Sequence, residues 1–250
     1  MRVVSYTGRV TAGAVGGFAV VLGMTGCGSS GSAGASAKVT SAVPFPVAVG
    51  NTWTYKTTGT RGSKTVTTGT QTDKVTAVAP GPGGQKVTFM VTQVTGGVPV
   101  RSGVYYTFGA NGAITASAYF TPSATGQPEG GAPSAGYLKF PSTADLASGK
   151  PETQSLTEPV QIGTGTHQET NRITIQGKGT GTVTVPAGTY QAVIVTETQT
   201  ISVVGGHNTM TARTTTWLAP GVGPVKELVS LQIGRVSGLT TVELKSFSKG

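Results

Sequence analysis

Apolar and polar residues alternate with a period of two along most of the chain after about residue 50, as expected for β-strands with one face turned inward. Trp53 and Tyr55 alternate with Thr52, Thr54 and Lys56, for example. Threonine, valine and aromatic residues, which favour strands, dominate these runs. A 3.6-residue apolar period does not persist over helical length in this part of the chain. The pattern predicts an all-β fold.

We expect roughly ten to twelve strands, joined mostly as antiparallel meanders. Asn111-Gly112, between two alternating runs, is a strong hairpin signal. The sequence Pro220-Gly221 is well suited to a sharp turn. The predicted strands are 52–56, 63–79, 85–94, 104–108, 114–120, 172–176, 182–185, 190–204, 209–218, 225–233 and 239–247.

Two stretches interrupt this pattern. Residues 121–135 are rich in Pro, Gly, Ser and Thr, and residues 141–158 also lack a clear period. Both are expected to be irregular, with a helical turn at 145–147. Between them, residues 137–140 are expected to form either a short strand or a docked segment. Long loops within a compact domain are often functional, although they are equally consistent with a variable surface.

The first 27 residues have the layout of a secretory signal. Arg2 and Arg9 precede an uncharged apolar run, which leads to Thr25-Gly26-Cys27. A cysteine in this position resembles a bacterial lipobox, in which the thiol is acylated and the chain is cut just before it. The alternatives are an ordinary signal peptide with an incidental cysteine and a short membrane helix. The apolar run is shorter than the ~20 residues that a spanning helix needs.

This N-terminal pattern predicts three regions and a location. Residues 1–26 are a lipoprotein signal peptide, residues 27–43 are the acylated Cys27 with a flexible Gly/Ser/Ala tether, and residues 44–250 are a single antiparallel β domain. Cys27 is the lipidation site, so the expected partner is the cell membrane. The domain is expected to be held by a lipid anchor on the extracytoplasmic face of that membrane. We also expect it to be monomeric.

The net charge and the potential catalytic or metal-binding residues limit the classes of function that the sequence supports. The net charge of +9 invites a nucleic-acid interpretation, but the basic residues are scattered and not interleaved with aromatics. We therefore expect no nucleic acid. The two histidines, His167 and His207, are far apart, and no zinc, nucleophile-elbow or phosphate-loop motif is present. We expect no metal, no cofactor and no enzymatic activity.

Two motifs resemble a known family. One is the opening 49–55, Val-Gly-Asn-Thr-Trp-Thr-Tyr, and the other combines Val-Pro-Ala-Gly at 185–188 with Trp-Leu-Ala-Pro-Gly-Val-Gly at 217–223. Their order and spacing are similar to those of DUF3108-like exported proteins and lipoproteins. The resemblance implies a curved antiparallel sheet, a half-barrel or open barrel of the LolA/LolB type with few or no helices. LolA-type sheets carry lipid or acyl chains, which would make a hydrophobic ligand or lipid the cargo.

Aromatic residues are the candidate ligand contacts on the concave face of such a sheet, and the alternative is that they form the core. Trp217 in particular is expected to be buried beneath the Pro220-Gly221 corner. A second hypothesis for the whole protein is a structural or accessory envelope protein that acts through protein–protein contacts. The candidate lining residues are Trp53, Tyr55, Phe89, Tyr106, Phe108, Tyr119, Tyr190 and Trp217.

Overall fold

The computed structural model describes the chain from Phe45 onward, with short gaps. The predicted signal peptide, the tether and Cys27 lie outside the described residues, as does the side chain of Tyr119. None of the helices in the part that is described is long and apolar enough to cross a membrane. The described residues are 45–61, 64–81, 84–109, 113–122, 128–129, 138–162, 165–203, 209–234 and 236–250.

The described chain is almost entirely β-structure, with one short helix, α1 (Thr143–Ser148). All paired strands are antiparallel. The prediction of an all-β antiparallel meander is confirmed. The strands are β1 (Thr52–Arg61), β2 (Lys64–Gly81), β3 (Gly84–Thr95), β4 (Val98–Gly109), β5 (Ile114–Pro122), β6 (Pro128–Glu129), β7 (Leu138–Phe140), β8 (Glu152–Ile162), β9 (Gly165–Val185), β10 (Gly188–Val203), β11 (Thr209–Ala219), β12 (Gly223–Ile233) and β13 (Val236–Ser248).

Two meanders form one continuous sheet. The spatial order is β6-β5-β4-β3-β2-β1-β13-β12-β11-β10-β9-β8, with β7 paired to β5. β1 and β13, the first and last strands along the chain, therefore pair in the middle of the sheet. Their pairing runs from Thr52 opposite Ser248 to Thr60 opposite Leu239. Strands β8 and β6 lie at the two ends of the sheet.

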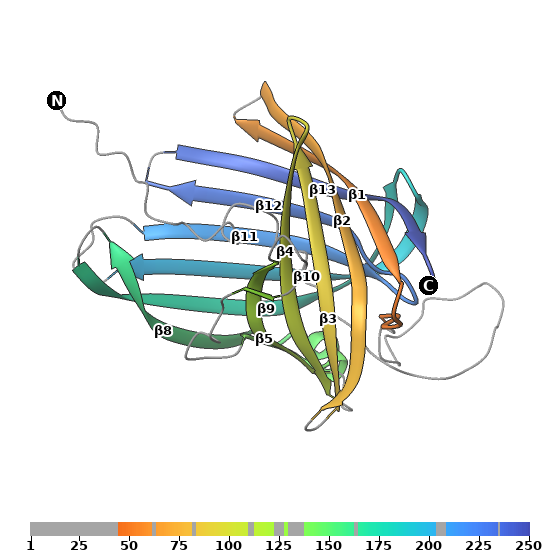
Figure 1. Ribbon diagram of the computed structural model, residues 1–250, viewed down its shortest axis with the longest axis horizontal. Helices are drawn as coiled ribbons and strands as arrows, with labels where there is room; N and C mark the ends of the chain where they lie inside the picture. Colours follow the sequence, from red (N-terminus) through yellow and green to blue (C-terminus); the bar gives the residue numbers. More distant parts are fainter. Residues whose placement is uncertain are drawn as a thin grey trace.

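The sheet folds back on itself into a nearly closed barrel. Figure 1 shows β2–β5 crossing steeply over β8–β12, with β1 and β13 joining the two layers. The apolar faces of the two layers pack against each other, as in orthogonal sheet packing. One end of β9–β12 extends beyond the strands that cover the rest of this layer (Figure 1).

An aromatic cluster fills the covered end of the barrel. Phe45, just before β1, stacks on Trp53 with ring centroids 4.8 Å apart, and it also contacts Phe89 and Phe108. The Trp53 indole N–H donates to the Val222 carbonyl at 2.6 Å. Phe45 and Trp53 thus lie beneath the β11–β12 corner, and their burial supplies much of the apolar driving force at this end.

A side chain spans the remaining seam between the ends of the sheet. The amide of Gln154, in β8, accepts from the Lys139 backbone N–H at 2.9 Å and donates to the Lys139 carbonyl at 2.6 Å. Lys139 belongs to β7, which pairs with β5. One glutamine side chain therefore takes the place of a backbone pairing between β7 and β8.

The segment 141–158 differs from the sequence-based expectation. The predicted helical turn is confirmed as α1, which begins with a capping box formed by Ser142 and Asp145. The rest was expected to be irregular, but β8 begins at Glu152. The reason is that β8 is an end strand whose residues are mostly polar, and its side chains at 152–157 are mostly exposed. It therefore lacks the apolar alternation that identifies inner strands.

Strand β9 is also longer than expected. The sequence predicted separate strands at 172–176 and 182–185, on either side of the glycine-rich residues 177–181. In the structure these residues form a register shift opposite Val193–Val195, with Gly179 at φ +88°, and the strand continues. The glycines mark a bulge within one strand.

Candidate functional site

Three carboxyl groups occupy inward positions of the sheet. Asp73, on β2, lies opposite Trp53 of β1, and Glu227, on β12, lies opposite Val242 of β13. Glu197 follows Val195 on the inner face of β10. Asp73 and Glu227 are each only 1% exposed. We call these three residues the carboxyl belt.

Asp73 is held by a chain of amides. The Gln71 amide N–H₂ donates to both Asp73 carboxyl oxygens, at 3.0 and 3.2 Å. Gln93, from β3, donates to the Gln71 side-chain oxygen at 3.1 Å. Burial raises the pKa of Asp73 from 3.8 to about 7, and the Gln71 hydrogen bond lowers it only in part. Desolvation therefore outweighs hydrogen bonding at this carboxyl.

Glu227 and Asp73 lie close enough to Tyr55 for their charges to act on it. Burial raises the pKa of the Tyr55 phenol well above its usual value, with further contributions from the charges of Asp73 and then Glu227. The phenol donates to the Pro224 carbonyl at 3.2 Å. Tyr55 thus connects the carboxyl belt to the aromatic cluster.

Glu197 lies further toward the less covered end. Burial raises the pKa of its carboxyl to about 7. Its Oε2 atom is shielded from solvent and accepts no hydrogen bond from the described residues, and the same holds for Oδ1 of Asn171 on β9. A shielded acceptor with no donor is uncommon in folded proteins. The position suits a group that donates a hydrogen bond.

The net charge of the carboxyl belt depends on how far its carboxyl groups are protonated. Among the described residues no lysine or arginine is buried. A pKa of about 7 for Asp73 and Glu197 means that both are divided between neutral and ionised forms near neutral pH. A cationic or donating molecule would shift them toward the ionised form.

Beyond the belt, the inner face is less covered. Ile201 lies opposite Met210, and Ala212 lies opposite Leu231, on the inner face of β10–β12. All four side chains are half-buried, unlike those of the aromatic cluster. They lie near the end of β10, the start of β11 and the end of β12. This surface is apolar and keeps some access to solvent.

The predicted aromatic contacts fall mainly in the packed core. Trp53, Tyr55, Phe89, Tyr106 and Phe108 are each at most 5% exposed and belong to one hydrophobic cluster. Phe45 packs against three of them. A ligand would have to displace Phe45 to reach these rings.

The other predicted contacts lie elsewhere. Tyr190 is half-buried and donates to the Ala187 carbonyl of its own turn at 3.3 Å. The expectation that Trp217 is buried beneath the corner is wrong, because it is half-buried and shares the outer face with its pair partner Lys226. Its inward neighbours Thr216 and Leu218 are buried instead. Tyr119 and Cys27 lie outside the described side chains.

Sequence reasoning missed the carboxyl belt. The three carboxyl groups belong to three separate strands, β2, β10 and β12, so no short spacing along the chain indicates them. A period-two signal was present: Gln71 and Asp73 precede the buried Val75, and Glu197 follows Val193 and Val195. Polar residues at inward positions of a strand are the sign to seek. In the described part of the chain no three His, Cys, Asp or Glu side chains are placed to hold a metal.

One solved structure with the same architecture supports this fold, and a second is similar to a lesser degree. A candidate lipoprotein from Parabacteroides distasonis ATCC 8503 superposes with a TM-score of 0.53 at 15% identity, covering 81% of this chain and 97% of that one. An exported protein of YmcC-like fold from Bacteroides fragilis NCTC 9343 gives 0.46 at 15% identity, covering 84% and 100%. No curated protein matches the sequence. The DUF3108-like family model matches residues 48–241, so the chain belongs to the DUF3108-like family.

Proposed function

We propose that this chain is an exported protein, anchored to the extracytoplasmic face of the membrane through acylated Cys27, that binds an amphipathic ligand on the inner face of its barrel. The signal-like N-terminus supports the anchor. The candidate lipoprotein of the same fold is consistent with it.

The ligand surface runs from the carboxyl belt to the half-buried ends of β10–β12. The apolar part of the ligand lies along Ile201, Met210 and Leu231, and a donating or cationic group meets Glu197. The observation that carries the proposal is the shielded Glu197 Oε2, which accepts no hydrogen bond from the described residues. Apolar pockets with a few placed polar groups are typical of small-molecule sites.

The test uses a neutral apolar dye and two competitors of equal chain length. Dodecylamine should displace Nile red from the full chain more effectively than dodecanoate does, because only the amine complements Glu197. Glu197→Gln should weaken displacement by dodecylamine about tenfold, as expected for the loss of one charge-assisted contact. Glu243→Gln, on the outer face, is the matched control.

Native mass spectrometry of the chain purified from its host is the second measurement, and we expect a co-purifying lipid-like mass that Glu197→Gln reduces. If Nile red does not bind, or if both glutamate variants behave alike, the ligand site is not here. Lipidation is tested separately through Cys27, so the two parts of the proposal can fail independently.

A further inference from the structure

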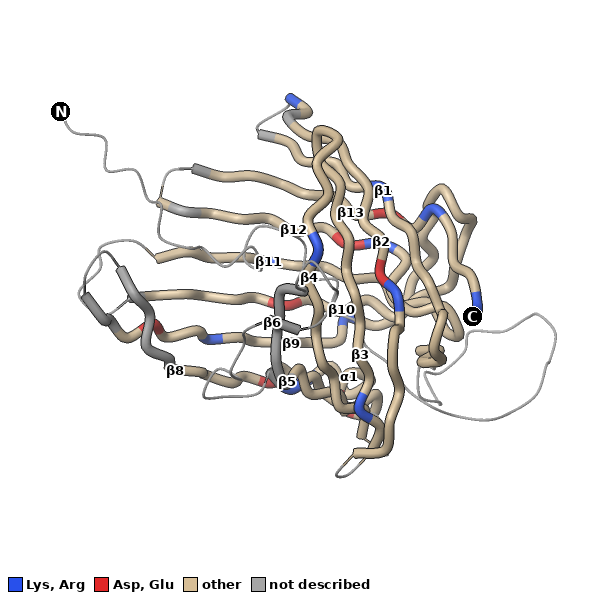
Figure 2. Tube along the Cα trace, viewed as in Figure 1, with Lys and Arg blue, Asp and Glu red and all other residues tan. Residues whose placement is uncertain are grey.

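The sheet separates its charges by face. Strands β1–β4, β12 and β13 contain three acidic residues, of which Asp73 and Glu227 point inward. The third, Glu243, points outward and is paired with Lys226 at 2.9 Å. The outward basic residues of these strands exceed this one acid, so the outer face carries net positive charge. Figure 2 shows where the basic and acidic residues lie along the strands.

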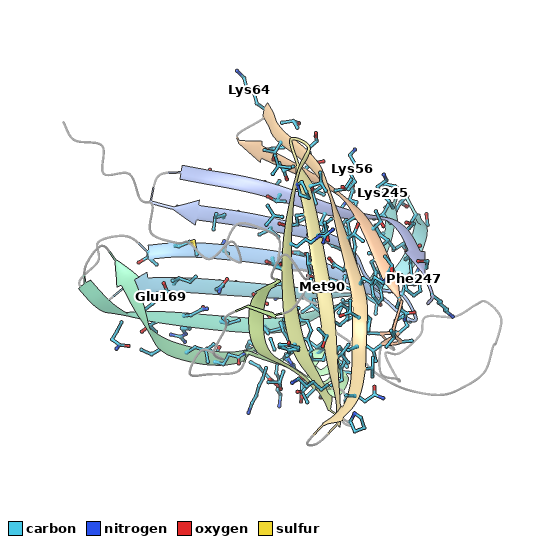
Figure 3. The ribbon with its side chains drawn as sticks, in the orientation of Figure 1. Lys56, Lys64, Met90, Glu169, Lys245 and Phe247 are labelled. Atoms are coloured by element: carbon cyan, nitrogen blue, oxygen red, sulfur yellow. The ribbon has the colours of Figure 1, made fainter. Side chains whose placement is uncertain are left out.

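Four exposed cations form what we call the basic outer face: Lys56, Lys74, Arg101 and Lys245. Lys56 on β1 pairs with Thr70 on β2, and Lys74 pairs with Thr52. Lys245 is the extra residue at the β1–β13 register shift, beside Thr54. Figure 3 shows Lys56 and Lys245 on the same outer side of the sheet.

Hydroxyl groups lie between these cations in rows that cross the strands. Neighbouring strands are about 4.8 Å apart and alternate residues along a strand about 6.7 Å apart, which gives a regular array of short donors and acceptors. One row joins Arg101 to Thr92, Thr72, Thr54 and Ser246. The row two residues beyond Lys56 joins Thr68, Thr58 and Thr241.

We propose that the basic outer face binds a hydrated anionic polymer that is rich in hydroxyl groups. The cations are separated along and across the strands, which suits a chain of repeated charges better than one compact anion. Threonine and serine hydroxyls between them provide hydrogen bonds to the polymer's own hydroxyl groups. Lysine serves as a point charge toward such anions.

A lipid bilayer is a poorer match for the same face. Surfaces that rest on membranes insert large apolar or aromatic side chains. Across the outer face of β1, β2, β3 and β13, the described large hydrophobic side chain that is exposed is Leu239, at 42%. The surface is polar and hydroxyl-lined, so a hydrated polymer fits it better. This inference is independent of the ligand proposed for the inner face.

The experiment measures binding of fluorescent poly(glycerol phosphate) to the full chain in a neutral detergent, by anisotropy. We expect binding that weakens about tenfold as salt rises from roughly 50 to 200 mM, because screening shortens the range of the attraction. The triple variant Lys56→Gln/Lys74→Gln/Lys245→Gln should bind at least about tenfold more weakly. Its control, Lys139→Gln/Lys150→Gln/Lys178→Gln, removes the same charge at exposed lysines elsewhere and should change binding less than about twofold.

Two further probes separate the possible sources of the anion. Polygalacturonate carries carboxylates in place of phosphodiesters, and its binding with the same variant pattern supports a general polyanion site. Thr58→Val/Thr241→Val should weaken both polymers without changing the charge. Equal losses in the two lysine sets would show a nonspecific charge effect and overturn the proposal. Binding to phosphatidylglycerol bicelles without binding to either polymer would overturn it in favour of a membrane surface.

Discussion

The most unusual residues of this protein are carboxyl groups that fold inward without a buried cation among the described residues. Asp73 shows how such a group is accommodated. Its two oxygens accept from Gln71, and Gln93 in turn fixes Gln71. The cost of desolvation nevertheless prevails and raises its pKa to about 7. A proton therefore stabilises the fold at this site.

This proton makes stability depend on pH in a defined direction. The pKa of Asp73 rises on folding from 3.8 to about 7, so its favourable contribution is complete at low pH and is lost as pH rises through that interval. The loss is on the order of 4 kcal/mol at 1.36 kcal/mol per pKa unit. Asp73→Asn places a side chain there that does not titrate, so this variant should lose most of the pH dependence of stability.

Urea unfolding of both proteins at pH 4 and pH 8 measures the effect. Between pH 4 and pH 8, the free energy of unfolding should fall more for the unsubstituted chain than for Asp73→Asn. Glu152→Gln, at an exposed carboxyl on β8, should follow the unsubstituted chain at both pH values. Parallel pH profiles for Asp73→Asn and the unsubstituted chain would show that the buried carboxyl is already ionised in the fold.

At the scale of elements, close backbone approach decides how the smaller pieces pack on the sheet. Helix α1 lies against β9 at Gly177, where an added Cβ would overlap the Leu146 carbonyl. The Gln154 amide then ties the neighbouring β8 to β7. The first contact depends on Gly177 and the second on Gln154. A substitution at either residue should therefore disturb the packing at this corner of the barrel.

Gly177→Ala should therefore displace α1 and destabilise the protein by roughly 1–3 kcal/mol, as overpacking does. Gly181→Ala, on the same strand, is the control, because its Cβ would meet only the end of the Ile194 side chain at 3.2 Å. Urea midpoints compare the two variants, and hydrogen exchange at residues 143–148 reports on the helix. Similar midpoints and unchanged exchange would show that α1 is not held by this approach.

The sequence could predict the strands because most of them have one apolar face. It could not predict β8, whose side chains are mostly polar, or the continuity of β9 through its glycines. The site was harder, because Asp73, Glu197 and Glu227 lie on three separate strands, and only the fold shows that all three occupy inward positions. Composition and spacing along the chain carry little information about such cross-strand proximity.

At the scale of the whole molecule, the proposed lipid anchor at Cys27 precedes the barrel along the chain. The barrel begins near Phe45, and the predicted tether precedes it. Cys27→Ala should abolish labelling with a palmitate analogue and membrane association, because its thiol is the proposed acylation site, while the β-type circular dichroism spectrum should stay unchanged. Ser29→Ala is a control near the same site. Persistent labelling and membrane fractionation of Cys27→Ala would contradict the anchor.

The pairing of β1 with β13 sets the timing of folding. A chain that is exported from its N-terminus delivers β1 long before β13, yet Trp53 and Phe247 stack at 5.0 Å in the finished sheet. Contacts between such distant residues form late and slow the search for the native state. Until β13 is available, β1 is an open edge of the first meander, and such edges invite wrong pairings. Pairing of the final strand closes this edge and ends the interval in which wrong pairings can form.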